Sequence, residues 1–242
     1  MVALSVLRAT RAQLLPWRRQ PPQGVAASLL KHAADQTVAA TVAVVNALTA
    51  AKLPLESFRD WGVLAAPCFF GRRDMAQAFE RYATDGAWGI SPHLVPNVSL
   101  HAVSGTISQA LELHGCNFGI GGGPSAAAEA FLATPVLLGG GNLPGLWLIL
   151  SSFFPEFLPG CRDEEAAECL TAALALTGND GDHEASCLRI CPRHTGDDED
   201  DMSEFSLPAF AAALGCRADG HHHWRLPGAG WVELAMNAGQ GA

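Results

Sequence analysis

The sequence predicts an α/β layered fold, because Ala-rich helical segments alternate along it with short, nearly continuous apolar runs. Two of these runs, WGVLAAPCFF at 61–70 and LWLILSS at 146–152, have the length of strands, and the second is nearly continuous, as expected for a strand covered on both faces. Apolar residues make up 49% of the 242 residues and charged residues only 16%, which is enough to bury a sizeable core. We therefore expect a single domain over residues 1–242.

Several helices are expected between these strands. The stretch 35–52 is apolar on all sides, as is typical of a helix buried between layers, and Pro54 stops it. Asp74 is suited to cap a helix over 75–83, and Pro124 suits the first position of a helix that continues over 125–133. The composition also predicts helices over 98–113 and 164–176, and short strands over 117–120, 187–191 and 231–234.

Three regions carry less pattern. Residues 1–33 form a poorly assigned start that is interrupted by a Pro-rich break. Residues 179–204 are interpreted as an acidic loop insertion, since they contain the unbroken acidic run 197–201. Residues 205–242 are expected to form C-terminal strands and turns, with His221–His223 in a solvated turn.

Composition excludes some functions. The net charge of −9, without a stripe of Lys and Arg, argues against a nucleic-acid partner. No apolar stretch reaches the length of a membrane span, and seven cysteines fit a reducing compartment better than a disulfide framework. The basic start lacks the Ser richness of an organelle transit peptide. We expect a cytoplasmic protein.

A metal site has suitable residue types but not suitable spacing. His183, Cys187, Cys191 and His194 carry ligand atoms, yet structural zinc sites have tighter pairs such as C-x2-C. The triple glycine at 121–123 lacks the GK[ST] ending of a phosphate loop. No metal and no cofactor are expected.

The segment 91–130, SPHLVPNVSLHAVSGTISQALELHGCNFGIGGGPSAAAEA, resembles the N-terminal half of the β-ketoacyl synthase family, which has the thiolase-like fold. Residues 34–178 are similar to a short chain-length-factor-like subgroup that has only this half. Cys116 departs from the pattern, because the family has proline there. The matching residues are Ser91, Pro92, Pro96, Asn97, Ser104, Gly105, Gly115 and Asn117.

The resemblance implies one thiolase-like half, with αβα layers and a mixed central sheet. It places Pro124 where the family has its nucleophilic cysteine. Proline has no nucleophile and no backbone N–H, and losing an oxyanion-hole donor costs about 2.7–4 kcal/mol of transition-state stabilisation. The family's catalytic histidines and lysine belong to its C-terminal half, which the chain is too short to contain. The resemblance therefore implies a catalytically silent partner in polyketide, aryl-polyene or fatty-acid type biosynthesis.

The same resemblance implies where partners bind. The family pairs its subunits through the strand before the nucleophile, which here corresponds to Asn117, Phe118, Gly119, Ile120 and Gly121. The expected partner is an intact ketosynthase subunit or a second copy of the chain, together with an acyl carrier protein. His93 and Leu94 are expected to line an acyl tunnel, although Leu94 also fits an ordinary core position.

Two alternatives stay open. One is an acyltransferase or thioesterase-like enzyme that acts on carrier-protein-bound acyl chains through Ser125, although Ser125 also fits a second helical position where it bonds local backbone donors. An activated serine needs an adjacent base, and no Ser-His-acid arrangement is legible in the sequence. The other alternative is a non-catalytic homodimeric scaffold.

Overall fold

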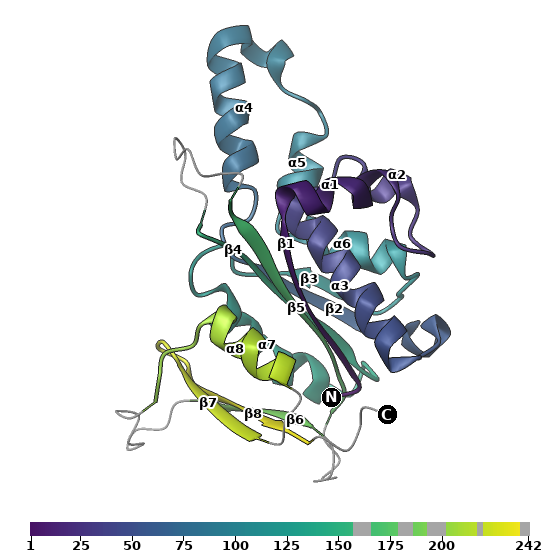
Figure 1. Ribbon diagram of the computed structural model, residues 1–242, viewed down its shortest axis with the longest axis vertical. Coiled ribbons are helices and arrows are strands. Elements are labelled where there is room, and N and C mark those ends of the chain that lie inside the picture. Colours follow the sequence, from purple (N-terminus) through teal and green to yellow (C-terminus); the bar gives the residue numbers. More distant parts are fainter. Residues whose placement is uncertain (157–165, 179–185, 193–201, 217–219, 238–242) are drawn as a thin grey trace.

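A five-stranded mixed sheet lies at the centre of the computed structural model, which describes residues 1–156, 166–178, 186–192, 202–216 and 220–237 (Figure 1). Strands β2, β3 and β4 run parallel to one another, whereas β1 and β5 are antiparallel to their neighbours. The predicted α/β class with a mixed central sheet is confirmed. In spatial order the strands are β1 (Ala3–Thr10), β5 (Glu168–Leu176), β4 (Leu146–Phe154), β2 (Gly62–Pro67) and β3 (Asn117–Gly119).

Helices cover both faces of this sheet. On one face, α3 (Asp35–Ala51) and α6 (His101–Ala110) pack against apolar side chains of β2, β4 and β5. On the other face lie α7 (Ala126–Gly139) and α8 (Leu207–Cys216). The αβα layering expected from the family resemblance is therefore confirmed. Residues 35–44 of α3 are all buried, which explains why most of its sequence is apolar, with Asp35 as a buried charge at its start.

A second, three-stranded sheet packs against α8. Its strands, in the order β6 (Cys187–Pro192), β8 (Gly230–Met236) and β7 (Gly220–Leu226), are antiparallel. An aromatic cluster of Phe131, Phe205, Phe210 and Trp224 joins this sheet to α7 and α8, with ring centroids 5.2–6.3 Å apart. The strands predicted near 187–191 and 231–234 are confirmed.

A helical arm, residues 72–98, projects beyond the end of the sheet (Figure 1). It consists of α4 (Arg72–Asp85), the 3-10 turn η2 (Gly86–Gly89) and α5 (Leu94–Val98). The arm exposes large apolar side chains, among them Phe79, Tyr82 and Trp88. The side chain of Trp88 is almost fully exposed, at 99%. Beside α3 lie α1 (Arg11–Arg19) and α2 (Ala27–Leu30), while the 3-10 turn η1 (Leu55–Phe58) precedes β2.

The predicted helix over 164–176 is wrong, because its described part forms strand β5 from Glu168 to Leu176. Almost every residue of β5 is buried, since β1 and β4 flank it and helices cover both of its faces. A strand buried on both faces needs no polar alternation, so its Ala-rich sequence resembles that of a helix. Residues 164 and 165 lie outside the described part of the chain.

The histidine run and the N-terminus also differ from expectation. His221–His223 belong to strand β7, which pairs with β8, rather than to a turn. The next residue of this strand, Trp224, is buried, and the His222 ring stacks on it with centroids 5.7 Å apart. The poorly assigned start contains β1, whose eight residues all pair with β5. The C-terminal region 205–242 contains α8 besides its strands.

Smaller corrections concern helix ends and the acidic insertion. Gly71, not Asp74, precedes α4 and caps it without a side-chain hydrogen bond. The helix expected over 98–113 is shorter than predicted, because α6 spans only His101–Ala110 and Val98 ends the preceding helix α5. Within 179–204 the described residues 187–192 form β6 rather than a loop, and the acidic run at 197–201 lies outside the described residues.

Candidate functional site

The carboxyl ends of β2, β3 and β4 meet at one edge of the sheet, where open α/β sheets place their ligand sites. Strand β2 leads into Cys68 and Phe69, β3 into the glycines at 121–123, and β4 into Glu156. The Phe69 N–H donates a hydrogen bond to the Gly122 carbonyl oxygen at 3.1 Å, which joins the first two of these loops. We call this the strand-end site, and it consists of Cys68, Phe69, Gly121, Gly122, Gly123, Pro124, Ser125 and Glu156.

The turn between β3 and α7 requires glycine. Gly121 and Gly122 have φ angles of 81° and 94°, in the left-handed region. A Cβ at position 121 would lie 2.5 Å from the Cβ of Ala126, so a side chain there would collide with the helix start. The segment 117–130 therefore folds as expected, as a short strand, a tight bend and a helix with a buried face.

Pro124 is exposed in the bend, and α7 begins two residues later than expected, at Ala126. Ser125 is the N-cap of this helix rather than its second residue, and its side chain makes no capping hydrogen bond, contrary to expectation. Among the described residues no histidine or carboxylate is hydrogen-bonded to its exposed hydroxyl. Position 124 thus provides no nucleophile, and the described part of the chain provides no activating base for Ser125.

Sequence reasoning missed the Cys68 thiol, which lies half-buried at the end of β2. Burial raises the pKa of this thiol, and a hydrogen bond with Ser152 offsets part of the effect. The Gln36 side chain donates a hydrogen bond to the Cys68 carbonyl oxygen at 3.0 Å and so fixes the backbone. Because the thiolate is the reactive form, the raised pKa keeps Cys68 a poor nucleophile near neutral pH.

Glu156, which follows β4, and Arg72, which begins α4, lie near each other at the strand-end site. The Arg72 guanidinium lies 3.7 Å from the centroid of the Phe69 ring, and its Nη1 lies 3.9 Å from the Glu156 Oε1. Burial raises the pKa of Glu156 to about 7, although the charge of Arg72 acts in the opposite direction. The strand-end site thus contains a carboxyl group that changes its charge near neutral pH.

Replacing Glu156 with glutamine is expected to remove a pH-dependent loss of stability. The folded-state pKa of Glu156 lies above the unfolded value of 4.5, because burial favours its neutral form. The stability that the neutral carboxyl group contributes is fully present below about pH 4.5 and is lost as the pH rises through about 7. Urea unfolding measures the free energy of unfolding of Glu156→Gln and of the parent at pH 4 and at pH 8. The difference in favour of the variant should be larger at pH 8 than at pH 4. Glu80→Gln, on the exposed side of α4, serves as the control, and a difference that does not change with pH would contradict this prediction.

The structure brings His93 and Leu94 to a different place from the strand-end residues. Leu94 begins α5 and is half-buried, while His93 is exposed and its ring stacks on His32 with centroids 5.6 Å apart. Both line a cavity of about 350 Å³ whose other walls include Arg11, Arg18 and Arg81. This cavity has a largely polar lining, unlike the apolar wall expected of an acyl tunnel.

Strand β3 forms an edge of the central sheet and pairs, among the described residues, only with β2. The Cys116 carbonyl oxygen and the Ile120 N–H bond to β2, so by alternation the N–H groups of Asn117 and Gly119 face away from it. Phe118 is 44% exposed and Val136 of α7 is 74% exposed. Both line an open groove of about 650 Å³ beside this edge.

Within the described residues, no helix combines the length and the apolar composition needed to cross a membrane. The same part of the chain contains no cluster of three or more His, Cys, Asp or Glu residues that could hold a metal ion. Cys187 and Cys191 lie half-buried on β6, while His183 and His194 lie outside the described residues.

Comparison with solved structures identifies the fold. A chain of the ketosynthase ApeO in complex with its chain length factor ApeC, from Xenorhabdus doucetiae, superposes with a TM-score of 0.57 at 10% sequence identity. The match covers 97% of this chain and 100% of that chain, so the two have about the same length. This chain has the ketosynthase fold.

Two further similarities to ketosynthase-fold structures are looser. A chain of the AntDE:AntF complex, a type II polyketide synthase acyl carrier protein with its ketosynthase, has a TM-score of 0.49 at 13% identity, covering 79% of this chain and 70% of that one. The ishigamide ketosynthase/chain length factor gives 0.41 at 12% identity, covering 59% and 42%. No family model matches the sequence, and no curated protein matches it significantly.

Proposed function

We propose that the chain is a catalytically silent, chain-length-factor-like partner of a ketosynthase. The observation that carries this proposal is Pro124, which stands in the bend between β3 and α7, where the ketosynthase resemblance requires a cysteine nucleophile. The exposed, unassisted hydroxyl of Ser125 and the raised pKa of Cys68 support it, since neither group replaces the missing nucleophile.

The proposed partner is an intact ketosynthase subunit, with a second copy of the chain as the alternative. The outer edge of β3, which no strand of the described residues pairs, supports this, because an open strand edge in a folded protein is normally paired or covered. The similar structure from Xenorhabdus doucetiae is a complex of a ketosynthase with its chain length factor, which agrees with such a pairing. The setting we propose is cytoplasmic assembly of a polyketide, aryl-polyene or fatty-acid type chain on an acyl carrier protein.

In this role His93 and Leu94 contribute to the wall of an acyl tunnel. Leu94 begins α5, the last helix of the helical arm. The exposed apolar side chains of this arm support a location of the arm beside another subunit. A bulky side chain in the tunnel limits chain length by its volume, since protein interiors accept little overpacking. The cavity behind Leu94 is polar, so in this proposal residues of the partner subunit supply the apolar part of the tunnel wall.

The purified chain, incubated with an acylated carrier protein, is expected to acquire no acyl group. Intact-protein mass spectrometry measures this directly, and Ser125→Ala and Cys68→Ala provide matched controls. An acyl adduct that disappears in Ser125→Ala would refute the silent partner and support the acyltransferase or thioesterase-like alternative. An adduct that disappears in Cys68→Ala would refute it as well and would identify the thiol as the nucleophile.

A further inference from the structure

The polar cavity of about 350 Å³ lies among α1, α4, α5 and the segment that leads into α3. Its α4 wall carries Asp74, Gln77, Ala78 and Arg81, whose spacing of three and four residues places them on one face of the helix. We call this space the arginine cavity. The charged and polar side chains around it are Arg11, Arg18, His32, Asp35, Asp74, Gln77, Arg81, Ser91, His93 and Asn97.

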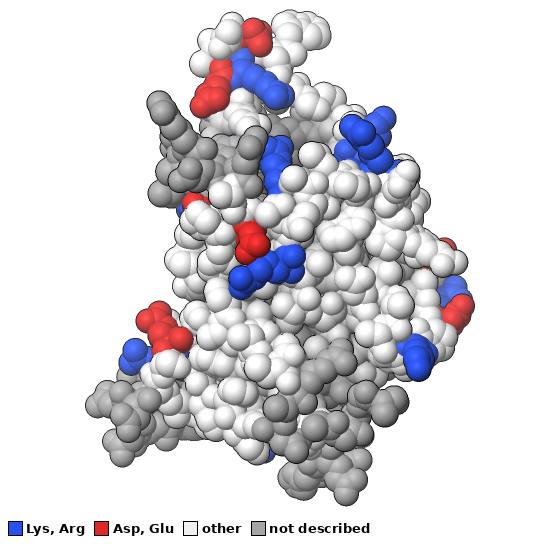
Figure 2. Space-filling view, in the orientation of Figure 1, with Lys and Arg blue, Asp and Glu red and all other residues white. Residues whose placement is uncertain are grey.

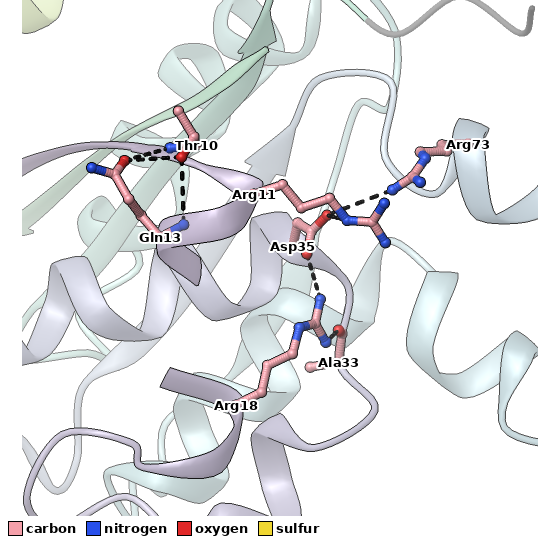
Figure 3. Close-up of polar contacts among 7 residues, drawn as sticks. All are labelled: Thr10, Arg11, Gln13, Arg18, Ala33, Asp35 and Arg73. Atoms are coloured by element: carbon pink, nitrogen blue, oxygen red, sulfur yellow. Dashed lines mark hydrogen bonds and ion pairs between the residues drawn. The ribbon is translucent and has the colours of Figure 1, made fainter. Parts of the chain in front are cut away.

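Asp35 orders the arginines on one side of the cavity (Figure 3). Its Oδ1 lies 2.5 Å from Arg18 Nη2, and its Oδ2 lies 3.3 Å from Arg11 Nε. Arg18 also donates a hydrogen bond to the Ala33 carbonyl oxygen. Because Arg11 contacts Asp35 through Nε, its terminal nitrogens point away from that carboxylate in Figure 3. The guanidinium of Arg11 is thus held in place with donors left for a ligand.

The cavity has an excess of positive charge. Arg11, Arg18 and Arg81 line it, against the two carboxyl groups of Asp35 and Asp74. Burial, followed by the charge of Asp35, raises the pKa of Asp74. None of the ion pairs found among the described residues involves Arg81. Figure 2 shows both basic and acidic side chains over the upper part of the molecule, where Figure 1 draws α4.

We propose that the arginine cavity binds a small molecule that carries a phosphate group, with Arg11 and Arg81 as the charged contacts. These two guanidinium groups approach from different helices, and the amides of Gln77 and Asn97 add further donors from α4 and α5. A phosphate group has three terminal oxygens that accept from several directions, whereas a planar carboxylate is satisfied by one guanidinium fork. The volume matches that of pockets for small ligands, which begin at about 300 Å³.

Titration of the full chain with inorganic phosphate, glycerol 3-phosphate and hexanoate at constant ionic strength tests this proposal. Both phosphates are expected to bind saturably and to shift the NMR signals of the Gln77 and Asn97 side-chain amides. Hexanoate is expected to bind at least about tenfold more weakly. Arg81→Gln should weaken binding of both phosphates about tenfold or more, because it removes a charge-assisted contact.

Arg19→Gln is the matched control, since it removes the same charge from the exposed side of α1 outside the cavity. It should change phosphate affinity by less than about twofold if the contact is local rather than a general charge effect. Gln77→Leu gives a second variant within the cavity, and circular dichroism confirms that each variant is folded.

Three results would overturn the proposal: no saturable phosphate binding, equal effects of Arg81→Gln and Arg19→Gln, or hexanoate binding as tight as phosphate. The measurement needs no partner subunit and no acyl chain. A failure of phosphate binding would therefore leave the proposed ketosynthase-partner role unaffected. A failure of the partner role would likewise leave the phosphate proposal unaffected.

Discussion

Replacing Phe118 with glutamate is expected to abolish association of the chain with its partner subunit while preserving its own fold. Phe118 stands in the middle of the edge strand β3 and is already partly exposed, so the isolated chain tolerates a charge there. In an assembly that extends the sheet across β3, the same charge would be buried without a counter-ion. Truncation of a hot-spot residue at the centre of an interface costs at least about 2 kcal/mol, or about thirtyfold in affinity.

Affinity co-purification after co-expression with an intact ketosynthase, followed by light scattering, measures this loss. Val136→Glu should behave in the same way, since Val136 lines the same groove. Leu15→Glu is the control, because Leu15 lies on α1 with a similar exposed fraction of 51%. Undiminished association of both groove variants would exclude this edge as the interface. Assembly with itself but never with a ketosynthase would favour the homodimeric scaffold.

The elements that the sequence predicts correctly are those whose composition reports their own surroundings. Strands β2 and β4 lie in the interior of the sheet, and their continuous apolar sequences follow from burial on both faces. Helix α3 is apolar all round because it packs against the sheet on one side and against α1 and α6 on others. In each case a local pattern was sufficient.

Strand β5 shows where local composition fails. The sequence ECLTAALAL has good helix formers and no polar alternation, so nothing in it distinguishes a buried strand from a buried helix. Pairing along its whole length with β1 and β4 decides the outcome, and its alanines leave room for α3 to pack closely. Such pairing partners lie about 20 and more than 150 residues away in the chain, beyond the range of any window.

The candidate site divides in the same way. The bend at 121–124 could be predicted because glycines at positive φ and a proline leave a readable pattern. The arginine cavity could not, because its charges come from segments that show no common motif. Asp35 meets Arg11, Arg18 and Arg73 only after α1, α3 and α4 have packed together.

Replacing Asp35 with asparagine is expected to destabilise the folded chain by about 3–5 kcal/mol. The Asp35 side chain is only 9% exposed, and Arg18 and Arg73 beside it are also largely buried. Asparagine keeps the size and one acceptor oxygen but removes the negative charge. The guanidinium groups of Arg11, Arg18 and Arg73 would then lose the carboxylate that they share in a poorly solvated place. Urea denaturation measures the loss, with Asp60→Asn as the control at an exposed position.

Salt separates this buried network from an ordinary surface ion pair. Buried pairs are screened much less than exposed ones, so the destabilisation by Asp35→Asn should largely persist at 1 M salt. A loss below about 1 kcal/mol, or one that disappears in salt, would be typical of an exposed pair. Asp35 would then not be the group that holds α1 against the start of α3. The ordered position of Arg11 at the arginine cavity would have to come from the packing of α1 itself, through the buried side chain of Leu14.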